Sequence, residues 1–341
     1  MDPRTGQVLA LASLPSYDNG VFGPPVHNRT LDRLARRPGH PMLDHATQVA
    51  APPGSTFKLV VASSDLAHRA IPAGLVVPTG GSWTLDGHVF HNWSALPPQD
   101  LRQAIAWSND VYFYKLAWAL GPRAMIQTAR ALGVGRPTGI DLPGESSGFL
   151  GTPGSVHRIG ADWYPGSTVL LGIGQGYLTT TPLQSAVWTA AVATGSVVTP
   201  HLGLAAEDRN GTLRSFRWPA PKRLPFARLL GPVRAGMRAA VTSGTAMPLA
   251  SLSVPAGGKT GTAEDPTAPG AGVDSWLSAV APIHSPVVEV TAFIHGGNGG
   301  EISTEPVRAS LAYFLSHRGA TLTARSVTRH RSGHRRSRTT R

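Results

Sequence analysis

The chain contains no cysteine, few lysines and no long apolar run. The lack of cysteine excludes disulfides, thiolate metal sites and a cysteine nucleophile, so an acyl-transfer or hydrolytic enzyme of this sequence must use serine, threonine or a carboxylate. Its apolar runs, such as residues 287–294, are far shorter than the roughly 20 residues that a bilayer span requires. We therefore expect neither a membrane anchor nor a signal peptide in this chain.

Acidic residues are also scarce, because 31 lysines and arginines stand against 19 acids and give a net charge of +12. Residues 325–341 supply seven arginines and no acid. The simplest interpretation is a disordered, solvated tail over residues 320–341, behind a single domain of residues 1–319. A tail that holds nucleic acid is the competing interpretation, and removal of residues 325–341 would distinguish the two. We expect no nucleic-acid partner.

The hydrophobic pattern is that of a folded protein, with 41% hydrophobic residues. One strand is predicted near the N-terminus, mostly helices in the middle, and two strands and a helix near the C-terminus. This order indicates an α+β domain whose first strand joins the last ones. The predicted strands cover residues 7–14, 275–281 and 287–294, and the predicted helices cover 101–106 and 111–120 and begin at Ser55 and Thr304.

Ser55 and Lys58 form an S-x-x-K pair at the start of an apolar segment. Residues three apart on a helix share one face, so the lysine amine can take the proton of the serine hydroxyl. Gly54 lets the chain turn sharply before the serine, and the helix N-terminus supplies N–H groups that can stabilise an oxyanion. Such a pair alone is common on ordinary helix surfaces.

Two further motifs follow in the chain. Ser108, Asn109 and Asp110 separate two predicted helices, where such residues are typical caps. Lys259 begins a K-T-G-T segment behind two glycines, on an extended stretch suited to a peptide carboxylate. Each motif alone also fits an ordinary loop or surface turn. In the order S-x-x-K, S-x-D, K-T-G, however, they are the set of penicillin-recognising serine enzymes.

Lysine usage supports the same interpretation. Only four of the 31 cationic residues are lysines, and two of these four, Lys58 and Lys259, stand in the motifs. Arginine keeps its proton at any ordinary pH, whereas a lysine can release one and act as a base. The lysine at position 58 therefore indicates a chemical requirement.

At this point the chain resembles the class B penicillin-binding proteins, with the middle-motif aspartate of their elongation-type members. The resemblance covers residues 1 to about 264 and, more weakly, continues to about residue 318. It implies a five-stranded antiparallel sheet flanked by helices, an all-helical subdomain, and an active cleft between them. The segments that carry it are MDPRTGQVLALASLPSYD, PPGSTFKLV, SNDVYFYKLA, LLGIGQGYLTTTPLQ and VPAGGKTGTAE, with SWLSAVAP as the weaker one.

The resemblance also implies the catalytic roles. Ser55 would be the nucleophile, Lys58 its base and Ser108 a relay for the proton that passes to the departing D-alanine. Asp110 would position Lys58, and Lys259 would keep the cleft electropositive.

The implied substrate contacts come from the last two motifs. Asn109, Thr260, Gly261 and Thr262 would bind the substrate, with the two threonines on its terminal carboxylate. The N–H groups of Ser55 and Thr262 would form the oxyanion hole. The segment 180–184 matches a family signature for which we expect a structural role.

The function implied is a peptidoglycan D,D-transpeptidase that is covalently inhibited by β-lactams and works on the extracytoplasmic face of the bacterial membrane, without metal or cofactor. Its expected partners are stem peptides and, through N-terminal regions absent from this chain, a membrane glycosyltransferase. A D,D-carboxypeptidase, a β-lactamase or a catalytically silent β-lactam sensor stays open, because the three motifs do not decide what attacks the acyl-enzyme. Neither Glu145 nor Glu207 stands in the context of a deacylating glutamate.

Overall fold

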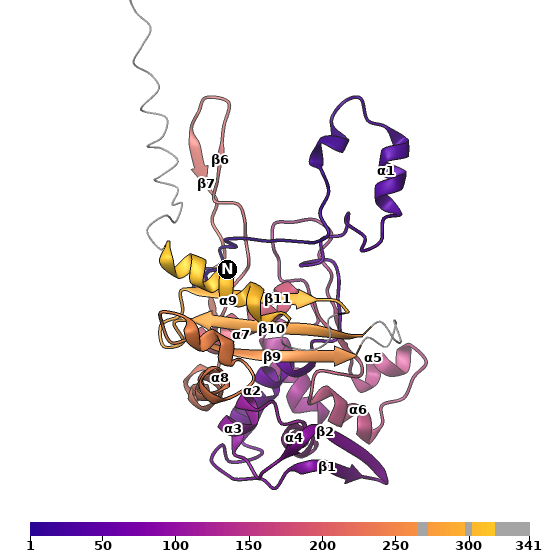
Figure 1. The fold of residues 1–341 in the computed structure, drawn as a ribbon, viewed down its shortest axis with the longest axis vertical. Coiled ribbons are helices and arrows are strands. Elements are labelled where there is room, and N and C mark those ends of the chain that lie inside the picture. The colour runs from indigo at the N-terminus through magenta and orange to yellow at the C-terminus, as the bar shows by residue number, and fades with distance from the viewer. Residues whose placement is uncertain (265–271, 297–301, 318–341) are drawn as a thin grey trace, which may run out of the picture.

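The computed structural model describes residues 1–264, 272–296 and 302–317. Its centre is an antiparallel sheet in the order β11, β10, β9, with helix α7 on one face and helices α8 and α9 on the other (Figure 1). The strands are β9 (Gly257–Glu264), β10 (Val273–Ala281) and β11 (Val288–Ile294), and the helices are α7 (Pro182–Thr194), α8 (Gly231–Ser243) and α9 (Thr304–Ser316).

The middle strand β10 is buried on both faces, in agreement with the apolar residues at six of its nine positions. Leu277 and Ala279 join a core cluster with α8 and α9, whereas the hydroxyl of Ser278 bonds to Ser185 of α7 at 2.9 Å. The period of two along the strand therefore assigns one face to α7 and the other to α8 and α9.

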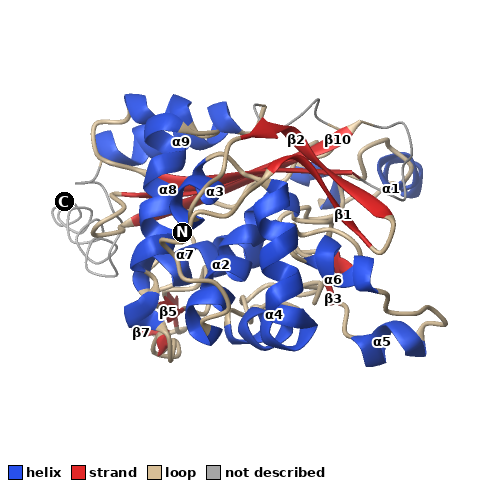
Figure 2. Cartoon of the chain, turned by 90° about the horizontal axis from the view of Figure 1, so that it is seen from below, coloured by secondary structure: helices blue, strands red, loops and turns tan. Residues whose placement is uncertain are grey.

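The helices α2, α3 and α4 form a second body beneath the sheet (Figure 2). Helix α2 is buried over its first eight residues, in agreement with its apolar sequence. The observed α3 coincides with the predicted helix 101–106, and the predicted helix 111–120 lies inside α4, which breaks at Gly121 (φ +69°). The bounds are α2 (Lys58–His68), α3 (Leu101–Ala106) and α4 (Asp110–Ala131).

This helical body also carries a β-hairpin, so the expectation of an all-helical subdomain is wrong. The hairpin packs on α4 through aromatic residues such as Phe90, whose ring lies 5.4 Å from that of Tyr114. The sequence between residues 80 and 96 alternates only partly, and most of its residues are exposed. Its strands are β1 (Gly80–Leu85) and β2 (His88–Leu96).

The α+β class is confirmed, but two details of the sheet differ from expectation. The described residues form three strands in the central sheet, not five. The predicted strand at residues 7–14 reduces to a single bridge between Gln7 and His201. The N-terminus does reach the sheet, because Met1 and Glu289 of β11 exchange two backbone hydrogen bonds of 2.8 Å. A run of apolar residues was therefore too weak a signal for a full strand there.

The remaining C-terminal predictions agree with the structure. Strands β10 and β11 cover the two predicted strands, and α9 begins at the predicted Thr304. The predicted domain boundary at residue 319 and the predicted tail, residues 320–341, lie outside the described residues. No helix in the described ranges is long and apolar enough to cross a membrane.

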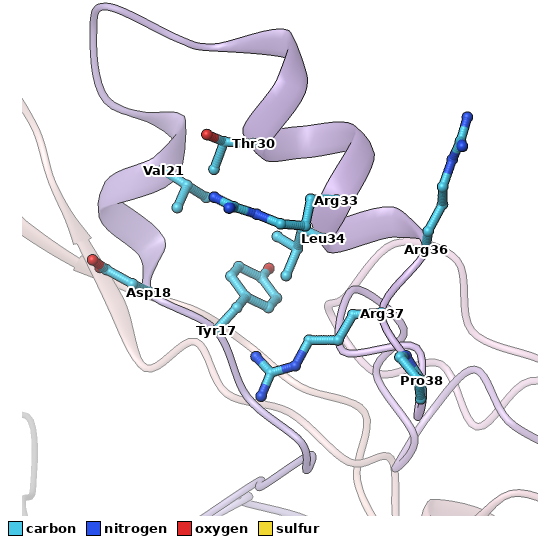
Figure 3. Close-up of a pocket in the computed structure, with 9 residues that line it drawn as sticks. All are labelled: Tyr17, Asp18, Val21, Thr30, Arg33, Leu34, Arg36, Arg37 and Pro38. Carbon is cyan, nitrogen blue, oxygen red and sulfur yellow. The ribbon is translucent and has the colours of Figure 1, made fainter.

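Residues 17–38 form a lobe that stands away from the sheet and contains η1 (Asn19–Phe22) and α1 (Asn28–Ala35) (Figure 1). A pocket of about 700 Å³ lies in this lobe, and Arg33 and Arg37 extend along it beside Tyr17 (Figure 3). None of the predicted catalytic residues lines it. The shorter elements elsewhere are β3 (Phe149–Leu150), α5 (Pro153–Arg158), α6 (Pro165–Leu171), β4 (Leu178–Thr179), β5 (Ser196–Val197), β6 (Ala205–Glu207), β7 (Leu213–Ser215), β8 (Lys222–Arg223), η3 (Ala227–Leu229) and η4 (Met247–Ser251).

Candidate active site

Ser55 lies in a short 3₁₀ turn, η2 (Gly54–Phe57), directly before α2. The backbone N–H of Lys58 donates to the carbonyl of Ser55, which closes this turn. Side chains three residues apart eclipse one another in a 3₁₀ helix, so the tight turn aligns the serine and lysine side chains better than an α-helix does. Ser55 is partly exposed, whereas Lys58 is fully buried.

Close backbone contacts hold this turn against β9. Gly54 has a φ of +52°, and a methyl group there would lie 2.3 Å from the carbonyl oxygen of Thr262. A methyl group at Gly261 would lie 2.9 Å from the carbonyl oxygen of Pro53. The glycines therefore allow η2 and the K-T-G strand to approach to backbone contact.

Lys58 is the residue on which the first two motifs meet. Its Nζ donates to Oδ1 of Asp110 at 2.6 Å, to the carbonyl oxygen of Ser108 at 2.8 Å and to Oγ of Ser108 at 3.3 Å. The lysine crosses between α2 and the loop before α4, two segments about 50 positions apart in the chain. The structure therefore brings Lys58, Ser108 and Asp110 together, as the family resemblance implies.

Ser108 has a left-handed backbone, with a φ of +55°. This conformation costs a residue with a Cβ about 1–2 kcal/mol and persists where the surroundings hold it. Here it directs both the carbonyl oxygen and the hydroxyl of Ser108 to the same lysine amine. The strained backbone of Ser108 thus holds its hydroxyl within hydrogen-bond distance of Lys58, as the expected relay requires.

The buried side chain of Asn109 caps helix α4. Its side-chain oxygen accepts from the N–H of Tyr112 and so caps α4, and its amide donates to Gln99 at 2.9 Å. The same oxygen also accepts from the amide of Asn92 at 3.1 Å. The side chain is fully buried and its polar atoms are bonded within the protein. The contacts assign Asn109 to the cap, and the predicted contact with substrate stays a prediction.

Lys259 and Thr260 lie at the middle of β9. Lys259 is fully buried, and its Nζ donates to the carbonyl oxygen of Thr260 at 2.8 Å. The hydroxyl of Thr260 lies 2.6 Å from that of Thr245, just after α8. The strand pairing places Lys259 opposite Ser278, whose hydroxyl bonds to α7, so the side chain of Lys259 faces α7. The side chain of Thr260, the next residue, therefore faces the opposite side of the sheet.

Thr262 is exposed at the edge strand of the sheet. In a β-strand the N–H and C=O of one residue point to the same side. Because the carbonyl of Thr262 faces Gly54, the N–H of Thr262 is directed toward η2 as well. This orientation is the one that an oxyanion hole between Ser55 and Thr262 requires.

Two buried lysines and a carboxylate set the electrostatics of the site. Burial lowers the pKa of Lys58, and the charge and hydrogen bond of Asp110 partly oppose this. Burial also lowers the pKa of Lys259, and the positive charge of Lys58 lowers the same pKa further. Two ammonium groups that are buried near each other disfavour simultaneous protonation, so the arrangement favours a neutral amine at the site.

The segment 180–184 has a structural role, as expected. The hydroxyl of Thr181 caps α7, and Gln184 completes the capping box. The amide of Gln184 donates to the carbonyls of Arg136 and Ser147.

The two glutamates considered for deacylation lie elsewhere in the fold. Glu145 accepts hydrogen bonds from Thr138 and Gly139 within its own loop. Glu207 ends β6 in a hairpin that projects away from α2 and β9 (Figure 1).

One residue that contacts the predicted site was missed. Asn92 of β2 accepts a hydrogen bond from the N–H of Asp110 at 3.0 Å and donates to Asn109. No motif marks Asn92, because it acts through a loop 18 residues later in the chain. Only the spatial contact between the hairpin and α4 reveals it.

The chain is similar to known transpeptidases over nearly its whole described length. The family model for the penicillin binding protein transpeptidase domain matches residues 1–312. A relative from Haemophilus influenzae, peptidoglycan D,D-transpeptidase MrdA, is 31% identical and aligns with 93% of this chain and 52% of its own length. MrdA of Escherichia coli K12 is 36% identical over 61% of this chain and 34% of its own length.

Solved structures agree with these relatives. Pseudomonas aeruginosa PBP2, in complex with WCK 5153, has a TM-score of 0.83 and 30% identity, covering 95% of this chain and 74% of that one. Helicobacter pylori PBP2, in complex with MreC, has a TM-score of 0.82 and 28% identity, covering 94% of this chain and 60% of that one. The chain spans about half the length of the first relative that it matches. With its first two motifs meeting at the buried Lys58 and the family model matching residues 1–312, the chain belongs to the penicillin-binding protein transpeptidase family, in the class B branch of the MrdA and PBP2 type.

Proposed function

We propose that this chain is the catalytic domain of a peptidoglycan D,D-transpeptidase, with Ser55 as the residue that is acylated. The observation that carries the proposal is the environment of Lys58, a buried amine that contacts Ser108 and Asp110 one tight turn after Ser55. A buried lysine can lose its proton near neutral pH and then serve as a base. The names of the relatives support the same activity.

The proposed reaction has two steps. Oγ of Ser55 attacks the carbonyl carbon of the penultimate D-alanine and passes its proton to Lys58, while the N–H groups of Ser55 and Thr262 bind the oxyanion. The C–N bond then breaks, and the proton reaches the departing D-alanine amine through Ser108. In the second step the amine of another stem peptide attacks the ester carbonyl and forms the new C–N bond, the ester C–O bond breaks, and a proton released by the attacking amine passes through Lys58 to Oγ of Ser55. A β-lactam ring would open in the first step and stay attached as an ester.

The substrate contacts remain part of the proposal. Thr260 and Thr262 would bind the terminal carboxylate, and Gly261 would let β9 lie close to η2, where a side chain would meet Pro53. Lys259 would add positive potential, to the extent that it holds its proton. We include Asn109 through its effect on the loop that carries Ser108 and Asp110.

We further propose that the activity is exerted on the outer face of the bacterial membrane, next to a glycosyltransferase. Two structures of relatives support such a setting, the H. pylori PBP2 complex with MreC and a peptidoglycan synthase complex that coordinates polymerisation and crosslinking. The regions that would make those contacts are expected outside this chain, since it aligns with 60% and 56% of those two chains.

Intact-mass analysis after incubation with penicillin tests the proposal. We expect one adduct on the wild-type chain and none on a folded Ser55→Ala variant. An adduct that persists for hours, together with exchange of a terminal D-alanine for a labelled D-amino acid, would support transpeptidation. Rapid loss of the adduct would indicate a hydrolase instead, and acylation without any exchange would indicate a sensor. Labelling that survives in Ser55→Ala would refute the assignment of Ser55 as the nucleophile.

A further inference from the structure

The β1–β2 hairpin has an irregularity at the point where it meets the predicted site. Ser82 pairs with His91 and Gly80 pairs with Leu96, so residues 92–95 of β2 stand opposite Gly81 alone. We call residues 92–95 the β2 bulge. Bulges bend a strand and turn side chains out of the regular alternation, and they occur frequently beside active sites.

Asn92 is the first residue of the β2 bulge, and both polar atoms of its side chain form hydrogen bonds within the protein. Its oxygen accepts from the N–H of Asp110 at 3.0 Å. Its amide donates to the side-chain oxygen of Asn109 at 3.1 Å and to the carbonyl of Gly80 at 3.3 Å. One side chain thus connects both strands of the hairpin to two consecutive residues of the middle motif.

Trp93, the next residue of the bulge, makes a second contact with the same loop. Its indole N–H donates to the carbonyl oxygen of Trp107 at 3.0 Å, directly before Ser108. The loop 107–110 is therefore held from outside by the hairpin at both ends. On its other side the loop contacts the Lys58 amine, through the carbonyl oxygen of Ser108 and the carboxylate of Asp110.

We propose that Asn92 is a positioning residue, which fixes Asp110 and Ser108 against Lys58 and so sets the protonation of the base. The proposal rests on the proposed function, because it assigns Asn92 to the base of that reaction. The N–H of Asp110 is the first of α4, where the helix itself offers no acceptor. The side-chain oxygen of Asn92 accepts this hydrogen bond and thereby fixes the backbone of Asp110, from which the carboxylate extends.

The consequence has a definite sign. Asp110 favours the ammonium form of Lys58 through its charge and its hydrogen bond. If Asn92→Ala lets Asp110 move away from the amine, this stabilisation weakens and the pKa of Lys58 falls. The charged groups near Lys58 in this balance are Asp110 and Lys259, and neither is changed by the substitution.

The low lysine content gives a direct measurement. The chain has four lysines, so a protein labelled with ¹³Cε-lysine gives four signals, and the Lys58→Arg variant identifies that of Lys58. We expect the titration midpoint of Lys58 to be lower in Asn92→Ala than in wild type. Ser94→Ala, an exposed substitution in the same bulge, is the matched control and should leave the midpoint unchanged. This titration needs no acylation, so it tests Asn92 even if the proposed function fails.

Acylation by a fluorescent penicillin gives the second readout. We expect Asn92→Ala to slow the second-order rate about tenfold, an effect of the size that the loss of one neutral hydrogen bond can have, and to move its pH midpoint downward. Asn92→Asp keeps the acceptor for Asp110 and adds negative charge, so the Lys58 midpoint should rise. An unchanged Lys58 midpoint in Asn92→Ala would overturn the proposal. So would shifts of the same sign in the Ala and Asp variants. If one variant is too unstable to study, a shift opposite to the expected one in the other variant would also overturn the proposal.

Discussion

Lys58 and Asp110 form a 2.6 Å ion pair in which the lysine is completely buried and the side chain of the carboxylate keeps 17% of its exposure. Burial penalises the charge on the amine, and the carboxylate partly restores it. The pair therefore places the lysine between the two requirements of a base, which must be neutral to accept a proton and charged after it has done so.

The first prediction concerns this pair. In Asp110→Asn the amine loses an anionic neighbour, so the pKa of Lys58 should fall and more of the neutral base should exist at neutral pH. The pH midpoint of acylation should therefore be lower in the variant than in wild type. Second-order rates of penicillin acylation between pH 5 and 10 measure it. A midpoint that stays or rises would show that Asp110 does not control the base.

The second prediction separates the charge of Lys58 from its chemistry. Lys58→Arg keeps the positive charge beside Asp110 but cannot release a proton near neutral pH. We expect acylation to fall by orders of magnitude, with a circular dichroism spectrum like that of wild type. If the variant acylates within about threefold of wild type, a barrier change below roughly 1 kcal/mol, Lys58 is not the base. Lys222→Arg, on exposed β8, is the control.

The third prediction tests the contact between η2, the turn that carries Ser55, and β9. In Gly54→Ala the new methyl group would lie 2.3 Å from a backbone carbonyl oxygen of Thr262, and the backbone is already left-handed. The turn must move, so acylation should fall sharply and the melting temperature should drop by at least about 2 °C. Gly74→Ala is the matched control, because no atom lies within 4 Å of its added methyl group. Equal behaviour of the two variants would contradict the contact.

Much of the candidate site was predictable because its residues lie in short local patterns. The placement of Ser55 one turn before Lys58 depends on a single 3₁₀ turn, and the caps of α4 and α7 depend on neighbouring residues. The meeting of Lys58 with Asp110 spans 52 positions. It was expected through the resemblance to a family, since no local rule of spacing brings a helix and a distant loop together.

The fold was harder to predict where pairing is long-range. The apolar run at residues 7–14 forms one bridge, because a strand needs a partner that sequence alone does not name. The hairpin β1–β2 was missed since most of its residues are exposed and its alternation is broken by the β2 bulge. For the same reason Asn92, which acts from that bulge, gave no signal in the sequence.

The fourth prediction concerns the basic tail, which lies outside the described residues. Residues 320–341 contain seven arginines, no acid and few apolar residues, so we expect them to be separable from catalysis. A shortened chain that ends at Gly319 should keep the melting temperature and the acylation rate of the full chain. A large drop in either quantity would show that the tail packs on the domain.

The fifth prediction concerns stability and rests on Asp65 near the end of α2. Burial raises the pKa of its carboxyl to about 6 from an ordinary value of 3.8, while one of its oxygens accepts from the N–H of Ile71. Its other oxygen is buried without a hydrogen-bond partner in the described structure. The folded state therefore holds this proton more tightly than the unfolded chain does.

The sign follows from this difference. An acid with a raised pKa contributes stability at low pH that is lost as the pH rises from about 4 through about 6. Asp65→Asn keeps the acceptor for Ile71 and cannot ionise, so it should not lose this contribution. The melting temperature of wild type should fall relative to that of the variant between pH 4.5 and pH 8, whatever the offset between them at the lower pH. A constant offset across this range would show that Asp65 does not titrate with a raised pKa in the folded protein.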